Sequence, residues 1–188
     1  MKIKYNAPTI LTYALLCAVV MALTATTLLP GLIQNWFRVP GKGNFLPSNP
    51  RHWLLLLTHA AGHSSWGHLV SNFSIILLIG PMLEECYSSL ALLAMIIITA
   101  LVTGILNVIF FTTGLMGASG AAFMMILLAS FTNFSRGEIP LTFILVLILY
   151  LGNQLFESLG TSNISHFAHI VGGFCGSLFG FLFPSRRY

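Results

Sequence analysis

Four polar residues interrupt stretches of this sequence that are otherwise apolar: Ser119, His169, His68 and Asn72. A serine hydroxyl attacks a carbonyl carbon when an imidazole takes its proton, and N–H donors stabilise the oxyanion that forms. Ser119 is the candidate nucleophile and His169 the candidate general base. His68, Asn72 and the backbone N–H of Ser119 are candidate oxyanion donors. These residue types are those of serine-based peptide hydrolysis.

A carboxylate that could complete a catalytic triad is missing. The chain has no Asp, and its four Glu (positions 84, 85, 138 and 157) fall at the ends of predicted membrane spans. We therefore expect a Ser-His dyad that needs no metal and no other cofactor, with the imidazole oriented by packing. Phe123 lies one helical turn after Ser119, where it can stack on His169.

Glycines beside these residues predict close helix packing. His169, Gly172 and Gly176 share one face of a helix, and Gly180 continues it. Small residues at such intervals let a neighbouring backbone approach closely. If that neighbour begins with Gly117-Ala118-Ser119-Gly120, His169 is brought against Ser119. His68 and Asn72 are four residues apart and also share a face.

The composition is that of a membrane protein. Of the 188 residues 56% are hydrophobic and 6% are charged, whereas roughly 25% of an ordinary soluble domain is charged. The net charge of +4 comes from scattered residues, so we expect no nucleic-acid partner. The three cysteines stand apart from one another, mostly in apolar runs, and indicate buried thiols instead of disulfides.

Six membrane spans are predicted, because a span needs about 20 apolar residues and five long uncharged stretches are present, one of them long enough for two helices. The fold class is an all-α membrane protein, a six-helix bundle forming a single membrane domain over 1–188 without a soluble domain. The helices are expected near 9–29, 64–82, 88–110, 119–133, 139–156 and 166–183.

The charges suggest an orientation. Lys2, Lys4, Arg136, Arg186 and Arg187 would lie on the cytoplasmic side together with both termini. The opposing cations all fall in the first outer loop: Arg38, Lys42 and Arg51. This loop also holds or adjoins all three tryptophans, at positions 36, 53 and 66, so we expect it to be embedded in the headgroup layer.

The fourth helix is expected to be short. About 15 residues rise roughly 22 Å, less than the roughly 30 Å of a bilayer core. If its inner end reaches the cytoplasmic surface, Ser119 lies below the outer surface, and the non-helical residues 112–118 dip to membrane depth. Such a segment must be buried in protein or line a water-filled cavity. The length therefore predicts an aqueous pit above Ser119.

Taken in order, these motifs resemble the rhomboid family of intramembrane serine proteases in its minimal six-helix bacterial form. The matching motifs are His63-x4-His68-x3-Asn72, Gly80-x3-Glu84 read as a turn after the second span, Gly117-Ala118-Ser119-Gly120, and His169-x2-Gly172-x3-Gly176.

The resemblance implies an endopeptidase with Ser119 as nucleophile, His169 as base and His68 and Asn72 at the oxyanion. Gly117, Gly120, Phe123, His63, Gly172 and Gly176 would support the site. The implied partners are transmembrane protein substrates and the lipid bilayer, and the implied location is the bacterial inner membrane, with the active site open to the outer, periplasmic side. Phe123 and Ser88 depart from the family pattern, which has Tyr and Gly at these positions in many members.

Two other functions fit the same residues. A metal-binding redox protein or transporter could use the imidazoles of His59, His63, His68, His166 and His169. A rhomboid-like binding protein would need no catalysis at all. Other intramembrane proteases are excluded, because the chain has neither an Asp pair nor an H-E-x-x-H motif.

Overall fold

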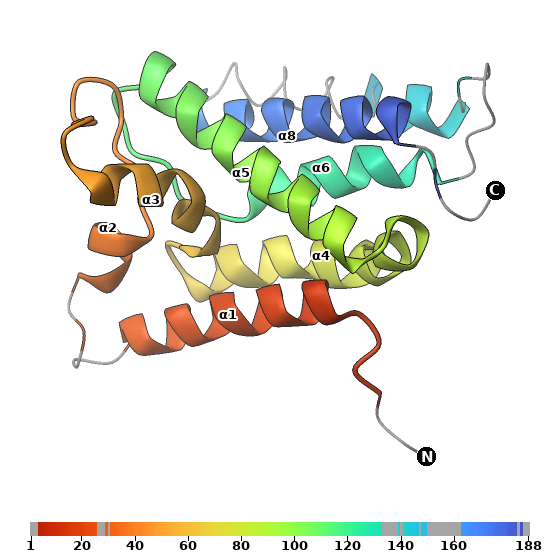
Figure 1. The fold of residues 1–188 in the computed structure, drawn as a ribbon, viewed down its shortest axis with the longest axis horizontal. Coiled ribbons are helices and arrows are strands. Elements are labelled where there is room, and N and C mark those ends of the chain that lie inside the picture. The colour runs from red at the N-terminus through yellow and green to blue at the C-terminus, as the bar shows by residue number, and fades with distance from the viewer. Residues whose placement is uncertain are drawn as a thin grey trace.

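The protein is all-helical over the residues described in this computed structural model, which are 4–25, 29, 31–132, 139, 141–146, 148–149, 163–183 and 185. No β-strand occurs in these residues, apart from one isolated bridge. The helices found there are α1 (Pro8–Ala25), α2 (Leu32–Trp36), α3 (Pro50–Thr58), the 3₁₀ turn η1 (His59–Ala61), α4 (Trp66–Tyr87), α5 (Ser89–Phe110), α6 (Ser119–Ala129) and α8 (Asn163–Leu182). Figure 1 shows α6 among the longer helices.

Three of these helices, α1, α4 and α5, are long and apolar enough to cross a bilayer. Their outer faces carry exposed large aliphatic side chains such as Leu16, Leu78 and Ile109. Such faces are stable against lipid but not against water, so the chain is a multi-pass integral membrane protein. The apolar helix α6 and the apolar part of α8 are shorter. Half of the span predicted over 139–156 lies outside the described residues; within it, residues 141–146 and 148–149 are helical.

Helix α4 differs from its prediction at the C-terminal end. The turn predicted over Gly80–Glu84 is wrong, because the helix continues through Pro81 to Tyr87. Packing against α1 explains this continuation. The Glu84 carboxylate is buried and accepts hydrogen bonds from the first backbone N–H groups of α1, Thr9 N at 2.8 Å and Ile10 N at 3.1 Å. Glu84 therefore caps a neighbouring helix from a position within α4.

The first loop contains two helices that the sequence patterns did not predict. In α3, Pro50 occupies the first turn and Asn49 accepts a hydrogen bond from Arg51 N at 3.0 Å, a typical N-terminal signature. The shorter helix α2 precedes it. Trp36 and Trp53, one on each helix, remain about half exposed, at 47% and 54%.

The segment between α5 and α6 is hydrogen-bonded to this first loop through its backbone. Val39 and Leu115 exchange two backbone hydrogen bonds of 3.0 Å, and Lys42 N donates to Phe111 O at 2.6 Å. These bonds satisfy backbone groups that would otherwise be unpaired. Helix α6 then begins at Ser119 as expected but ends at Ala129, earlier than the predicted 133.

Helix α6 is the centre of the bundle and contacts α4, α5 and α8. Eight of its eleven residues are buried. Its first two turns approach α8 closely, because a β-carbon at Gly172 would overlap the Gly120 carbonyl and one at Gly176 would overlap the Met124 carbonyl. The glycine face of α8 therefore packs backbone to backbone against α6.

Candidate active site

Ser119 is the first residue of α6 and is 8% exposed. The first N–H groups of a helix have no partner within it, and they carry the positive end of the helix dipole. The residue before the cap, Gly117, has φ of +129°, a conformation that L-residues with side chains rarely adopt. A sharp turn thus delivers the hydroxyl and the backbone N–H of Ser119 to the same small region.

The contact between α8 and α6 places His169 near the first turn of α6. His169 lies one turn before Gly172, which touches Gly120. Its imidazole packs on the Phe123 ring, with 4.1 Å between ring centroids and 36° between ring planes. Since Phe123 lies one turn after Ser119, the His169 ring is on the face of α6 that carries the serine.

His68 and Asn72 approach the same turn from α4. A β-carbon at Gly117 would lie 2.8 Å from His68 Cε1, 2.9 Å from His68 Nε2 and 3.8 Å from Asn72 Nδ2. The Asn72 side chain is buried, and its Nδ2 donor has no hydrogen-bond partner within the described part of the chain. An unpaired buried donor costs free energy, and such groups are characteristic of sites that bind something.

Two consecutive serines fix His68 through different atoms. Ser65 Oγ accepts from His68 N at 3.1 Å and caps α4, whereas Ser64 Oγ is hydrogen-bonded to His68 Nδ1 at 3.1 Å. The second bond leaves Nε2, on the opposite side of the ring, facing Gly117. Sequence reasoning missed Ser64. Its position four residues before His68 was the available signal, since such pairs meet across a helical turn.

His59 and His63 bond to backbone groups instead of pointing at a shared centre. The His59 carbonyl accepts from Gly117 N at 2.9 Å, and its Nε2 is bonded to Ala100 O at 3.0 Å. His63 Nε2 accepts from Ala118 N at 3.4 Å. Both residues thus fix the turn before Ser119. No group of three His, Cys, Asp or Glu side chains suited to a metal occurs in the described residues, which do not include the His166 side chain.

A family model for the Rhomboid domain matches residues 50–186, which is more than half of the chain and includes Ser119 and His169. The chain belongs to the rhomboid family. Members of this family are typically intramembrane serine proteases. A search of curated proteins finds no significant match. Helices α1 and α2 precede the part that matches the rhomboid model.

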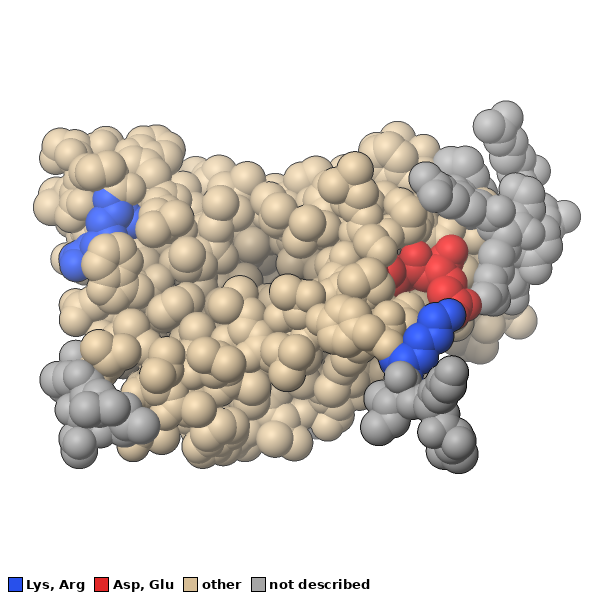
Figure 2. Space-filling view, turned by 60° about the horizontal axis from the view of Figure 1, so that its bottom comes forward, with Lys and Arg blue, Asp and Glu red and all other residues tan. Residues whose placement is uncertain are grey.

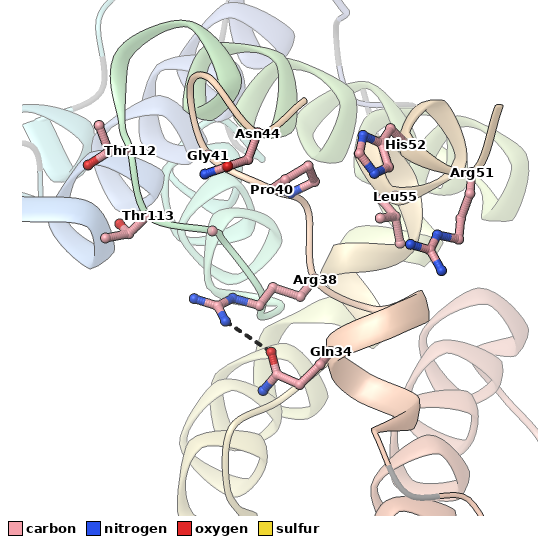
Figure 3. A pocket seen from close by; sticks show the side chains of 11 residues that line it. Gln34, Arg38, Pro40, Gly41, Asn44, Arg51, His52, Leu55, Thr112 and Thr113 are labelled. Atoms are coloured by element: carbon pink, nitrogen blue, oxygen red, sulfur yellow. Dashed lines mark hydrogen bonds between the residues drawn. The ribbon is translucent and has the colours of Figure 1, made fainter. Parts of the chain in front are cut away.

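A polar cavity lies next to the first loop, and the aqueous pit expected above Ser119 stays a prediction. The cavity has a volume of about 570 Å³ and opens between the first loop and residues 112–114, as Figure 3 shows. Ser119 is not among its lining residues. The bridge between Val39 and Leu115 packs the loop against the segment that leads to α6, and this contact could not be read from helix lengths.

Proposed function

We propose that this rhomboid protein is an intramembrane serine endopeptidase that cleaves transmembrane proteins with a Ser119–His169 dyad. One observation carries the proposal most directly: the imidazole of His169 packs on Phe123, one turn from Ser119, where Gly172 and Gly120 are in backbone contact. A base must lie next to its nucleophile, and this helix contact supports that arrangement.

The reaction would proceed through an acyl-enzyme. Ser119 Oγ bonds to the scissile carbonyl carbon while its proton passes to His169. The tetrahedral intermediate then collapses, the C–N bond breaks, and His169 gives the proton to the leaving amine. Water attacks the ester in the second half, with His169 again taking and returning a proton, and Ser119 is regenerated. No cofactor enters these steps.

Three donors are proposed to stabilise the oxyanion: Ser119 N–H, His68 Nε2 and Asn72 Nδ2. Both side chains approach Gly117, two residues before the nucleophile. His68 can donate from Nε2 if its neutral ring carries the proton there, and a Ser64 hydroxyl that donates to Nδ1 selects this tautomer. Removal of one such donor typically lowers kcat by about 100- to 1,000-fold.

The dyad would work without a carboxylate, because Phe123 and the close contact of α8 with α6 hold the imidazole. Gly117, Gly120, Gly172 and Gly176 support the site by allowing these approaches, and His63 supports it by binding Ala118 N.

The membrane arrangement is proposed in the same terms. Six spans form one membrane domain, with the fifth within 139–156 and both termini in the cytoplasm. The first loop lies in the headgroup layer of the outer side, and the active site opens to that side. In a bacterium this places the protein in the inner membrane with its site facing the periplasm.

Covalent labelling tests the proposal. A fluorophosphonate should label the detergent-purified chain, and labelling should be lost in Ser119→Ala and His169→Ala. Ser74→Ala is the matched control, since the Ser74 hydroxyl bonds the Val70 carbonyl within α4. Labelling that persists in Ser119→Ala would exclude this nucleophile.

Cleavage of a single-span model substrate in liposomes completes the test. The wild type should cleave it in the presence of EDTA, and both dyad variants should not, while remaining folded. A wild type that binds the substrate but neither cleaves it nor reacts with the fluorophosphonate would be a rhomboid-like binding protein. Loss of cleavage in EDTA would favour a metal-dependent function.

A further inference from the structure

A polar cavity beside the first loop is not used by the proposed hydrolysis. Its volume is about 570 Å³, and most of its lining side chains can donate hydrogen bonds. Figure 3 shows them arriving from separate segments, from α2, from the loop and α3, and from the residues before α6. The lining residues that donate are Gln34, Arg38, Asn44, Arg51, His52, Thr112 and Thr113.

The two arginines of this cavity are only partly satisfied by the protein. Arg38 Nη1 donates to Gln34 Oε1 at 3.0 Å, and the Arg51 guanidinium lies over the Trp36 ring, 5.9 Å from its centroid. The Nε atoms of both arginines are buried and have no hydrogen-bond partner in the part of the chain that the structure describes. Guanidinium groups that keep unused donors are suited to a bidentate oxyanion.

The acidic residues of the described chain cannot neutralise these arginines. Glu84 binds the N-terminus of α1, whereas Arg38 follows the C-terminal end of that helix and α2. An 18-residue helix is about 27 Å long. Figure 2 shows the acidic side chains at one end of the face in view, next to one basic group, and another basic group at the far end. Neither Glu84 nor Glu85 is thus placed beside the cavity, and its two arginines can take an anion from outside the protein.

The exposed side chains of the first loop are of the types found at the membrane–water interface, where lipid phosphates occur. Trp36, Trp53 and Trp66, in or next to the first loop, are 47%, 54% and 48% exposed, and Leu46 and Leu54 are also exposed. Exposed Trp beside exposed Leu is typical of the membrane–water interface. An anion at this depth in a membrane protein is most readily supplied by the phospholipids themselves.

We propose that this cavity binds the phosphate group of an anionic phospholipid from the leaflet that surrounds the first loop. Arg38 and Arg51 would hold the phosphate oxygens, and Asn44, Thr112 and Thr113 would donate further hydrogen bonds. The bound lipid would account for the two arginines, Arg38 and Arg51, in a loop proposed to lie on the outer side, against the usual distribution of charge. This inference does not depend on the proposed peptidase activity.

Lipid retention by the purified full chain tests the site. The chain in detergent is titrated with dioleoyl phosphatidylglycerol or dioleoyl phosphatidylcholine, and bound lipid is counted by native mass spectrometry. We expect phosphatidylglycerol to bind more tightly, and R38Q and R51Q each to weaken it about tenfold, since a charge-assisted hydrogen bond contributes roughly that factor. The matched control is K42Q, which removes the same charge from an exposed residue of the same loop outside the cavity.

Competition experiments distinguish a bound phospholipid from a bound free phosphate. Inorganic phosphate and glycerol 3-phosphate are added as competitors, and they should not displace the lipid at concentrations near the lipid's own Kd. If K42Q weakens phosphatidylglycerol binding as much as R38Q does, the lipid is attracted by general surface charge and not by the cavity. That result would overturn the proposal. Displacement by inorganic phosphate at such concentrations would make the cavity a phosphate site.

Two further results would contradict a lipid site in this cavity. Equal binding of both lipids to the wild type overturns the proposal without any variant, so a folding defect in R38Q or R51Q cannot hide a failure. Unchanged phosphatidylglycerol retention by R38Q/R51Q, together with weaker binding of a transmembrane substrate, would instead make the cavity a substrate site.

Discussion

The imidazole of His68 lies directly against the backbone of Gly117, so that a β-carbon at Gly117 would come within 2.9 Å of Nε2. Gly117 also has φ of +129°. A candidate oxyanion donor and the turn before the candidate nucleophile are thus in contact only because position 117 has no side chain.

Gly117→Ala is therefore expected to impair cleavage strongly. The substitution strains the backbone by about 1–3 kcal/mol and also displaces His68. We expect at least a tenfold loss of kcat in liposomes, measured with a single-span substrate. Gly43→Ala is the control, because Gly43 has φ of +83° but nothing within 4 Å of the place that a β-carbon would occupy. It should keep kcat, and an equal loss in both variants would exclude a specific role for the His68 contact.

Phe123→Ala is expected to loosen His169. An aromatic pair contributes about 0.5–1.5 kcal/mol beyond its burial, so kcat should fall about 2- to 12-fold. Phe123→Tyr keeps the ring and should retain most of the activity. Steady-state kinetics of both variants check this, and normal turnover by Phe123→Ala would show that the ring contact does not orient the base.

Ser64→Ala is expected to lower kcat about tenfold, less than loss of a whole oxyanion donor, because His68 loses the bond that selects its tautomer. Ser64→Thr keeps a hydroxyl and should restore the rate. Ser65→Ala removes the cap of α4 and should cost about 1 kcal/mol of stability, with kcat of the folded protein unchanged. Rate measurements and thermal unfolding of the three variants separate the two serines; similar kcat values for Ser64→Ala and Ser65→Ala would contradict this division.

Ser88→Gly is expected to stabilise the protein. Ser88 has φ of +83° and ψ of 156°, a region that is almost exclusive to glycine, and its hydroxyl makes only a long 3.4 Å bond to Ala91 N. Relief of the strain should raise the free energy of unfolding by about 1 kcal/mol. Ser88→Ala keeps the strain and loses the cap, so it should be less stable than the wild type. Thermal unfolding in detergent measures both, and a destabilised Ser88→Gly would show that the cap outweighs the strain.

Local patterns predicted the parts of the fold that depend on local chemistry. The family follows from the ordered motifs, and the packing of Gly172 on Gly120 follows from small residues at helical spacing. Helix α4 beyond Pro81 was missed, because the burial of Glu84 at the start of α1 is a contact between distant segments. The cavity between the first loop and residues 112–114 depends on similar long-range contacts.

Some residues of the candidate site could be predicted from the sequence, and others could not. The serine, histidines and asparagine are visible as polar residues in apolar sequence, and their roles stay predictions until they are tested. Ser64 was overlooked because α4 begins at Trp66 and not at 64, and the bond from Ser64 to His68 depends on the turn before the helix. In the sequence, Arg38 and Arg51 counted as positive charges on the outer side, which oppose the usual excess of Lys and Arg on the cytoplasmic side.

The paired backbones of Val39 and Leu115 give the loop a mechanical connection to the helix that carries Ser119. Leu115 is four residues from Ser119, so a displacement of the loop would reach the proposed nucleophile through a short stretch of chain. Turnover compared in membranes of shorter and longer acyl chains would measure whether bilayer thickness acts on the proposed site through this connection.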